Sequence, residues 1–430
     1  KNVVVLVISC YPHFSCLTSI PDSMNMSCCF ALFALAPYLA GAFLSENLKT
    51  SVGMRGFPLS QSSAVLETPP LIIIPAIDLY EREPPSMDIV RINNWASLRA
   101  TGGPDPFDLV SKELAPFSDN IKELVEADQP VLSSAASHFF AQRQGKRFRP
   151  TIVMLMAKAT AGTMVNTDTE AYNKQAQLGQ ITEMIHVASL IHDDVLDEAD
   201  TRRGGEAVHK MYSNKVAVLA GDYLLARASV LLAKLEEINV VQIMASALDS
   251  LVQGEIMQIK SAPGDVLEMK YYLKKSYYKT SSLICYACKS CAILGGHDVD
   301  SAITKAAEKF GFHFGLAYQI VDDILDFTGT SESLGKPAMA DVSLGLATAP
   351  ILYASMECRE LQPIIKRRFK GAGDAEEAYR LVMSTNGVAR AENLAIFHAT
   401  EAMDALKLLP PSEATTALVR LTEIVLTRTS

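Results

Sequence analysis

From Pro106 to the carboxyl end, hydrophobic positions recur at the three-to-four-residue spacing of one buried helix face, and the alternation typical of strands is scarce. Gly and Pro separate these segments. The pattern predicts helices over 107–141, 149–162, 169–197, 214–233, 238–260, 265–294, 300–326, 341–357, 373–406 and 412–428. Asp105 followed by Pro106 is a typical N-cap and first-turn pair. We therefore expect a single all-α domain over 106–430.

The amino end has a different pattern. Cys28–Leu44 is an apolar run shorter than the ~20 residues that span a bilayer, and it includes Ala40-Gly41-Ala42, which resembles a cleavage signal. A Ser-rich, weakly basic stretch that is typical of a transit peptide follows it. We expect 1–65 to be a targeting leader to an organelle, with a plastid favoured over a mitochondrion. The mitochondrial alternative and the true start residue stay open.

A Pro-rich connector follows the leader over 66–105 and closes with Gly102-Gly103-Pro104, so a long helix is excluded there. The expected organisation is therefore a leader over 1–65, the connector, and the helical domain over 106–430.

Composition narrows the class of protein. The chain has 39 basic and 48 acidic residues, a net charge of −9, which argues against nucleic-acid binding. Its eight cysteines are too few and too clustered for a disulfide scaffold. Cys285, Cys288 and Cys291 have metal-ligand spacing but lack a fourth ligand at a suitable distance along the chain. We expect these three to pack in the helical core.

An aspartate motif, D-D-x-x-D, occurs twice, each time at the end of a long apolar helix. The copies are Asp193, Asp194 and Asp197, and Asp322, Asp323 and Asp326. Residues i and i+4 share a helix face, and like charges at that spacing repel, so ordinary surface helices avoid the pattern. Mg²⁺ prefers carboxylate oxygens and takes substrate phosphates as further ligands. Two copies predict paired magnesium sites that hold a diphosphate between them.

Basic residues lie near both acidic clusters along the chain. They are Lys146 and Arg149 in G-K-R-F-R-P, Arg202 and Arg203 after the first cluster, Lys279 before Thr280, and Lys336 in the loop after the second cluster. Taken singly, each would be a solvated surface charge. Arg suits bidentate phosphate binding and Lys acts as a point charge, so the combination favours a phosphorylated substrate.

In this order, G-K-R-x-R-P, D-D-x-x-D with R-R-G, K-T, and Q-x-x-D-D-x-x-D with G-K resemble the trans-isoprenyl diphosphate synthases, or polyprenyl synthetase family. The resemblance covers about 106–430 and is greatest for the long-chain solanesyl and decaprenyl diphosphate synthases that make quinone side chains. It implies a single large orthogonal helical bundle with a central active-site cavity. It also implies a Mg²⁺-dependent, head-to-tail condensation of isopentenyl diphosphate onto an allylic diphosphate, with three ions, in a homodimer. A heteromer stays open.

The resemblance also implies individual roles. Asp193, Asp197 and Asp322 would bind Mg²⁺, supported by Asp194, Asp323 and Asp326. Arg202, Lys279 and Lys336 would hold the allylic diphosphate. Lys146, Arg149, His186 and Arg203 would hold isopentenyl diphosphate. Thr280 and Gln319 would line the reacting centre. One departure is Leu346, because many short-chain members have a second Lys there, whereas the quinone-chain branch often lacks it.

The resemblance implies that product length depends on the residues below the reacting centre, and that the controlling position lies five residues before Asp193. That residue is Ala188, and it and its neighbour Ser189 are small and leave the cavity open. The growing chain can then pass Ile185 along an apolar tunnel. This favours a product of about C40–C50, as the resemblance implies, with a shorter-chain geranylgeranyl diphosphate synthase as the alternative. Because such a product is strongly apolar, we also expect the protein to make peripheral contact with a membrane.

Three other functions receive less support. An HD-type metal phosphohydrolase, suggested by His192-Asp193, needs more histidines than the nearby His186 and His209. A di-iron protein would need a second copy of the motif Glu183-x-x-His186. A non-catalytic partner subunit is disfavoured because both aspartate clusters are intact.

Overall fold

The structure is a computed structural model of the chain. It describes 102–115, 121, 123–126, 128–141, 147–162, 166–202, 205–329 and 339–428, without the side chains of Phe139 and Ala141. All of these residues belong to the unit formed by Ile72–Ser430. The expected leader, most of the connector, and Lys146, Arg203 and Lys336 lie outside the described residues.

The described part of the chain is helical almost throughout, which confirms the predicted all-α class. Its longer helices are α5 (Pro130–Ala141), α6 (Phe148–Ala161), α7 (Glu170–Leu196), α9 (Asn214–Lys234), α10 (Ile238–Ile259), α11 (Met269–Ser276), α12 (Ser282–Leu294), α13 (Ala302–Thr328), α16 (Ala349–Glu357), α18 (Asp374–Met383), α19 (Gly387–Leu406) and α20 (Glu413–Thr427). Its shorter elements are η3 (Asp108–Val110), α3 (Ser111–Leu114), α8 (Val208–Met211), η4 (Asp265–Leu267), the π-helical turn η5 (Tyr277–Ser281), α15 (Ala340–Ser343) and α17 (Leu361–Lys366). Strands β1 (Thr201–Arg202) and β2 (Gly205–Glu206) form one small antiparallel pair.

Side-chain caps explain where the long helices begin. The Thr169 hydroxyl accepts a hydrogen bond from the Tyr172 amide at the start of α7, and Ser301 caps α13 in the same way. The Asp105 carboxylate accepts hydrogen bonds from the Phe107 amide at 2.9 Å and the Asp108 amide at 3.1 Å, so it caps the turn before η3. The N-cap residue of η3 itself is Phe107, and the element is short rather than the long helix expected there.

Several predicted helices are interrupted. The helix expected over 107–141 ends at Leu114, and α5 begins with Pro130, a residue favoured in a first helical turn. The segment 341–357 breaks at Gly345, whose φ of +80° is outside the helical region. The segment 373–406 divides into α18 and α19, and 265–294 includes the π turn η5. The sequence analysis did not predict α17.

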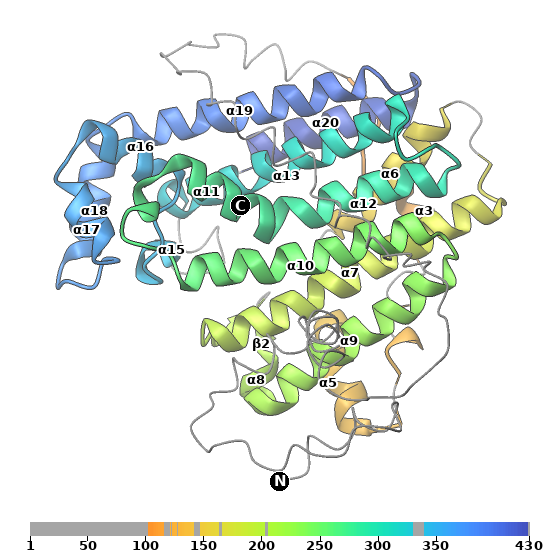
Figure 1. The fold of residues 1–430 in the computed structure, drawn as a ribbon, viewed down its shortest axis with the longest axis horizontal. Coiled ribbons are helices and arrows are strands. Elements are labelled where there is room, and N and C mark those ends of the chain that lie inside the picture. The colour runs from red at the N-terminus through yellow and green to blue at the C-terminus, as the bar shows by residue number, and fades with distance from the viewer. Residues whose placement is uncertain are drawn as a thin grey trace, which may run out of the picture. The chain divides into compact units, whose positions relative to one another are not determined.

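The core forms where the long helices pack together. Helix α13 packs between α12 and α19, α12 packs against α10, and α7 packs against α6 and α9 (Figure 1). The largest apolar cluster combines side chains from these helices, including Phe310 and Phe314 of α13. Cys285, Cys288 and Cys291 are free, fully buried thiols on α12, as expected for core residues.

Helix α9 is long and apolar enough to cross a membrane, by length and composition alone, and no other helix among the described residues is. It packs along α7 and α5, which is the packing of a core helix. Leu219 and Val230 remain exposed on its outer side.

Candidate functional site

The π turn η5 carries Lys279 and Thr280 and lies between α10 and α13. Such turns are rare and occur frequently at functional sites. A Cβ added at Gly254 of α10 would lie 2.7 Å from the Lys279 backbone nitrogen. One added at Gly315 of α13 would lie 2.6 Å from the Ser281 Cα. Glycine at both positions therefore allows two helices to approach the turn closely.

The first aspartate cluster lies on one side of this turn. Asp193 is in the last turn of α7, and Asp197 is the C-cap residue of that helix. The Lys279 ammonium lies 3.7 Å from the Asp193 carboxylate and 2.5 Å from that of Glu255 on α10. Burial raises the pKa of Asp193 to about 7, against the lowering effect of Lys279, and the charges of Glu255 and Asp197 add to the rise. Burial likewise raises the pKa of Asp197. Three carboxylates thus share one ammonium group.

Asp194 has a different environment from Asp193. Its carboxylate is buried and accepts a hydrogen bond from Arg202 Nε at 2.8 Å. The Arg202 guanidinium also forms an ion pair with it, and its side chain remains 34% exposed. Asp194 therefore fixes Arg202 next to the first cluster, where part of the Arg202 side chain stays accessible.

The second cluster belongs to the last turns of α13. The buried carboxylate of Asp323 accepts hydrogen bonds from the Tyr272 hydroxyl at 2.6 Å and from the Gln319 amide at 2.8 Å. Asp326 accepts from the backbone amides of Ala340 and Asp341, each at 3.2 Å, so it holds the start of α15. Burial raises the pKa of Asp323 to about 7, and the neighbouring Asp341 charge contributes to the rise.

Asp322 forms an ion pair with Arg428, near the carboxyl end of the chain, at 2.6 Å. The Arg428 guanidinium also lies 4.0 Å from the centre of the Tyr318 ring and donates to the Tyr318 carbonyl oxygen at 2.9 Å. Asp322, one of the expected metal ligands, is therefore already paired with a basic side chain.

The two clusters flank the same five-residue turn. Lys279 contacts Asp193 of the first cluster, and the next residue, Thr280, donates a hydrogen bond of 2.6 Å to Gln319. Gln319 in turn donates to Asp323 of the second cluster. The structure thus brings together the D-D-x-x-D motifs, the K-T pair and Gln319, as the sequence analysis expected.

The other expected site residues have fewer contacts with the two aspartate clusters. Arg149 is partly buried in the first turn of α6. The adjacent Phe148 ring lies 5.1 Å from that of Tyr318, which places the start of α6 against the helix of the second cluster. His186 is partly exposed on α7, and its carbonyl accepts from the Ser189 hydroxyl.

The expected chain-length residues face the interior. Ala188 and Ile185 of α7 are fully buried in the largest apolar cluster, and Ser189 is partly buried. They lie on the helix that ends in the first aspartate cluster. The tunnel that they would line stays a prediction.

Sequence reasoning missed five residues that contact the site: Glu255, Tyr272, Lys275, Asp341 and Arg428. One available signal was Gly254, because a glycine inside a helical segment often marks a close backbone approach. The other contacts join positions that are distant in sequence and have no local pattern.

The donor chemistry fits magnesium. Both clusters supply hard carboxylate oxygens, and burial raises the pKa values of Asp193 and Asp323, so a bound cation would offset the cost of ionising them. Among the described residues no group of three or more His, Cys, Asp or Glu side chains is already assembled around one point. Mg²⁺ does not need such a preassembled group, since it keeps several waters and takes phosphate oxygens as ligands.

His192 gives no support to a phosphohydrolase site. Its Nε2 lies 3.1 Å from the Val218 carbonyl oxygen and 3.7 Å from the Asp222 carboxylate. Both partners belong to α9 rather than to the aspartate clusters, so this imidazole contributes to helix packing.

Comparison with known proteins agrees with these observations. The family model described as "Polyprenyl synthetase" matches residues 129–382. Solanesyl-diphosphate synthase 1, mitochondrial, from Oryza sativa subsp. japonica is 45% identical over 341 residues, covering 76% of this chain and 79% of the relative. The decaprenyl-diphosphate synthase of Dictyostelium discoideum is 44% identical over 342 residues, covering 76% and 72%.

Solved structures show the same relationship. The apo form of an Arabidopsis medium/long-chain length prenyl pyrophosphate synthase is 38% identical, with a TM-score of 0.62 over 76% of this chain and 100% of that one. A polyprenyl synthase from Caulobacter crescentus CB15, complexed with calcium and isoprenyl diphosphate, is 29% identical, with a TM-score of 0.67 over 76% and 97%.

Proposed function

Because this chain belongs to the polyprenyl synthetase family, and is therefore a trans-polyprenyl diphosphate synthase, we propose that it extends an allylic diphosphate with isopentenyl diphosphate to about C40–C50 for a quinone side chain. The relatives named solanesyl, decaprenyl and hexaprenyl synthases favour a long-chain product over geranylgeranyl diphosphate and over phosphohydrolysis. The observation that carries the proposal is the pair of carboxylate clusters on either side of Lys279 and Thr280.

Members of this family depend on magnesium, and the residues present fit it. Asp193 and Asp197 would hold ions at one cluster and Asp322 at the other, with three ions in all. Bound Mg²⁺ would supply Lewis-acid stabilisation of the leaving diphosphate.

The protein's own groups would act with the ions on the allylic diphosphate. Lys279 is held in place by Glu255 and presents a fixed positive charge where the diphosphate leaves. Arg202, oriented by Asp194, would add a second charge, and Lys336 a third. Thr280 and Gln319 hold each other next to the reacting centre. After the allylic C–O bond ionises and diphosphate departs, the double bond of isopentenyl diphosphate attacks the cation to form the new C–C bond, and the departing diphosphate would take up the proton that is lost.

Isopentenyl diphosphate would bind to Lys146, Arg149, His186 and Arg203. The start of α6 packs against α13, which would bring Arg149 towards the second substrate. The growing chain would descend from Ala188 past Ile185, because these positions are small or apolar and face the interior.

The test is to incubate purified protein with Mg²⁺, labelled isopentenyl diphosphate and allylic primers of different lengths. Chromatography is expected to show incorporated label in products of about C40–C50, and a chelator is expected to stop the reaction. No incorporation with any primer would refute the proposal. Release of inorganic phosphate without isopentenyl diphosphate would favour a hydrolase.

The relatives also bear on location. Their names include mitochondrial and chloroplastic/mitochondrial enzymes, so we propose an organelle as the site of action. These names do not support the preference for a plastid over a mitochondrion. Fluorescence microscopy of the full chain fused to a fluorescent protein would distinguish the two organelles.

We propose a homodimer as the functional form. Helix α10 exposes Val252, Ile256 and Ile259 at helical spacing, which is an apolar stripe that a second copy would cover. An Ile256→Glu variant is expected to be monomeric by light scattering. A monomeric wild type would refute this assembly. If the variant remains dimeric, another surface forms the dimer.

Peripheral membrane contact, which the apolar product suggests, is tested by co-sedimentation with liposomes.

A further inference from the structure

Lys275 is a mostly buried lysine for which the proposed reaction, as described so far, has no role. It lies on α11 one helical turn before Lys279, so the two residues share a face of the chain. The charges that act on it are Asp323 and Asp341 at the second cluster, and Lys279 of η5 and Glu255 of α10 near the first cluster. Lys275 therefore lies between the two groups of residues that form the site.

The ammonium group of Lys275 has no ion pair or hydrogen bond among the described residues. Its recorded contact is with the Tyr272 ring, 5.6 Å from the ring centre. Asp323, an acidic group that acts on Lys275 electrostatically, already accepts hydrogen bonds from Tyr272 and Gln319. Burial lowers the pKa of Lys275, against the raising effect of Asp323 and Asp341. Buried lysines are almost always paired with an acidic group. An unpaired one such as Lys275 is therefore suited to binding an anion.

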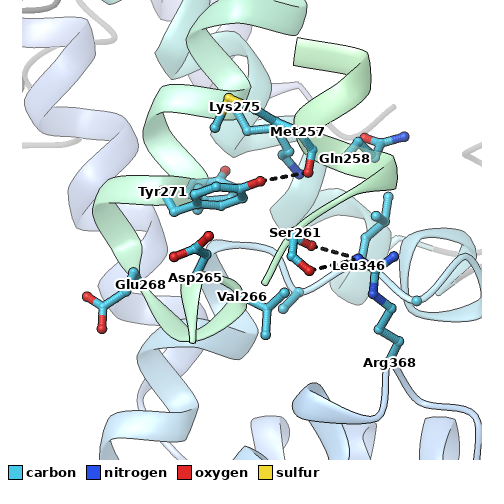
Figure 2. Close-up of a pocket in the computed structure, with 13 residues that line it drawn as sticks. Met257, Gln258, Ser261, Asp265, Val266, Glu268, Tyr271, Lys275, Leu346 and Arg368 are labelled. Atoms are coloured by element: carbon cyan, nitrogen blue, oxygen red, sulfur yellow. Dashed lines mark hydrogen bonds between the residues drawn. The ribbon is translucent and has the colours of Figure 1, made fainter. Parts of the chain in front are cut away.

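Lys275 can be reached from solvent. Together with Tyr272 it lines an open pocket, whose other walls include Asp265, Glu268, Leu346 and Arg368 (Figure 2). Arg368 is held by Ser261, to whose hydroxyl it donates at 2.8 Å. Leu346 is the position at which a second Lys was missing from the motif pattern, and its apolar side chain offers no charge. Lys275 thus supplies a cation to the same pocket.

We propose that Lys275 binds the diphosphate of the allylic substrate directly, and that it compensates for the absence of a cation at Leu346. The allylic diphosphate is favoured over that of isopentenyl diphosphate because Lys275 shares its helical face with Lys279 and lies beside Asp323. The inference rests on the proposed function and adds a substrate-binding residue to it.

The test compares Lys275→Met with the matched control Lys274→Met. Methionine removes the charge and keeps an unbranched apolar side chain. Lys274 is adjacent in sequence, but its ammonium lies over the Tyr278 ring instead, 5.8 Å from the centre. Steady-state kinetics would give the KM for each substrate and the inhibition constant of inorganic diphosphate, all in Mg²⁺.

The Lys275→Met variant is expected to raise the allylic KM and the inhibition constant of inorganic diphosphate about tenfold, because a charge-assisted hydrogen bond is lost. The KM of isopentenyl diphosphate is expected to change less than about twofold, the same as for Lys274→Met. Thermal unfolding of the ligand-free variant should occur no lower than in the wild type, since burial of the ammonium outweighs its contact with the Tyr272 ring and its attraction to Asp323 and Asp341. Adding Leu346→Lys to Lys275→Met is expected to recover most of the diphosphate affinity.

The outcomes separate this inference from the proposed function. An active wild type whose allylic KM and diphosphate inhibition are unchanged in both Lys275→Met and Lys275→Gln would overturn the role of Lys275 alone. A change confined to isopentenyl diphosphate would also overturn it. A double variant that recovers nothing would refute the compensation at Leu346. A wild type without prenyltransferase activity would instead refute the proposed function.

Discussion

Replacing Asp193 with Asn is expected to stabilise the metal-free protein and at the same time abolish its turnover. In the first cluster, Asp193, Asp197 and Glu255 surround the single ammonium of Lys279. The asparagine would keep the shape of the native side chain without its charge. Lys279 would retain its closer partner, Glu255 at 2.5 Å, so no buried charge would lose its only counterion.

The magnitude follows from the pKa of Asp193, which burial raises from 3.8 to about 7. Below pH 3.8 this residue is protonated in both the folded and the unfolded states and has no effect. As the pH rises towards 7, the unfolded state releases the proton first, so the folded state loses stability. Above pH 7 the penalty is complete. A tenfold change in proton affinity is about 1.4 kcal/mol, which sets an upper limit on the order of 4 kcal/mol.

Chemical unfolding of wild type and Asp193→Asn in a chelator, at pH 5 and at pH 8, would measure this effect. The free energy of unfolding of the variant should exceed that of the wild type, and by more at pH 8. Asp300→Asn is the control, because the Asp300 side chain is 92% exposed. Mg²⁺ with inorganic diphosphate should stabilise the wild type more than the variant. A variant that is less stable at pH 8, or that keeps wild-type turnover, would refute the reasoning.

Three further changes test other parts of the site. Ala188→Phe is expected to shorten the products seen by chromatography, and products of wild-type length would show that this position is not the gate. Gly254→Ala places a Cβ 2.7 Å from the Lys279 backbone nitrogen, so it should cost about 1–3 kcal/mol in unfolding free energy and also reduce turnover. Unchanged values for both would mean that the close approach is unimportant. Arg428→Ala removes a competitor for the Asp322 carboxylate, so half-maximal activity should need less Mg²⁺; a higher requirement would show that Arg428 supports metal binding.

The parts of the fold that depend on local signals could be predicted from the sequence. Helices α7 and α13 each combine an apolar face with a capping Thr or Ser at the start and acidic residues at the end. The helical periodicity and the two aspartate motifs therefore located both halves of the site. The π turn could not be predicted, because Tyr277–Ser281 continues the helical pattern of its neighbours.

The contacts that join distant parts of the chain could not be predicted either. The ion pair of Arg428 with Asp322 and the hydrogen bond of Tyr272 to Asp323 exist only because the helices pack as they do. The same holds for the position of Lys275 between the clusters. Nothing in the local spacing of these residues distinguishes them from ordinary surface charges or core aromatic residues.

The central claim is that both aspartate clusters bind one diphosphate through shared divalent ions. Its most direct test is a crystal structure with Mn²⁺ in place of Mg²⁺ and an unreactive thiolo analogue of the allylic diphosphate, with the ions located by anomalous scattering. We expect ions bound to Asp193 and Asp197 and to Asp322, all contacting the same diphosphate beside Lys279. Ions at one cluster only, or a diphosphate bound away from both, would contradict the account.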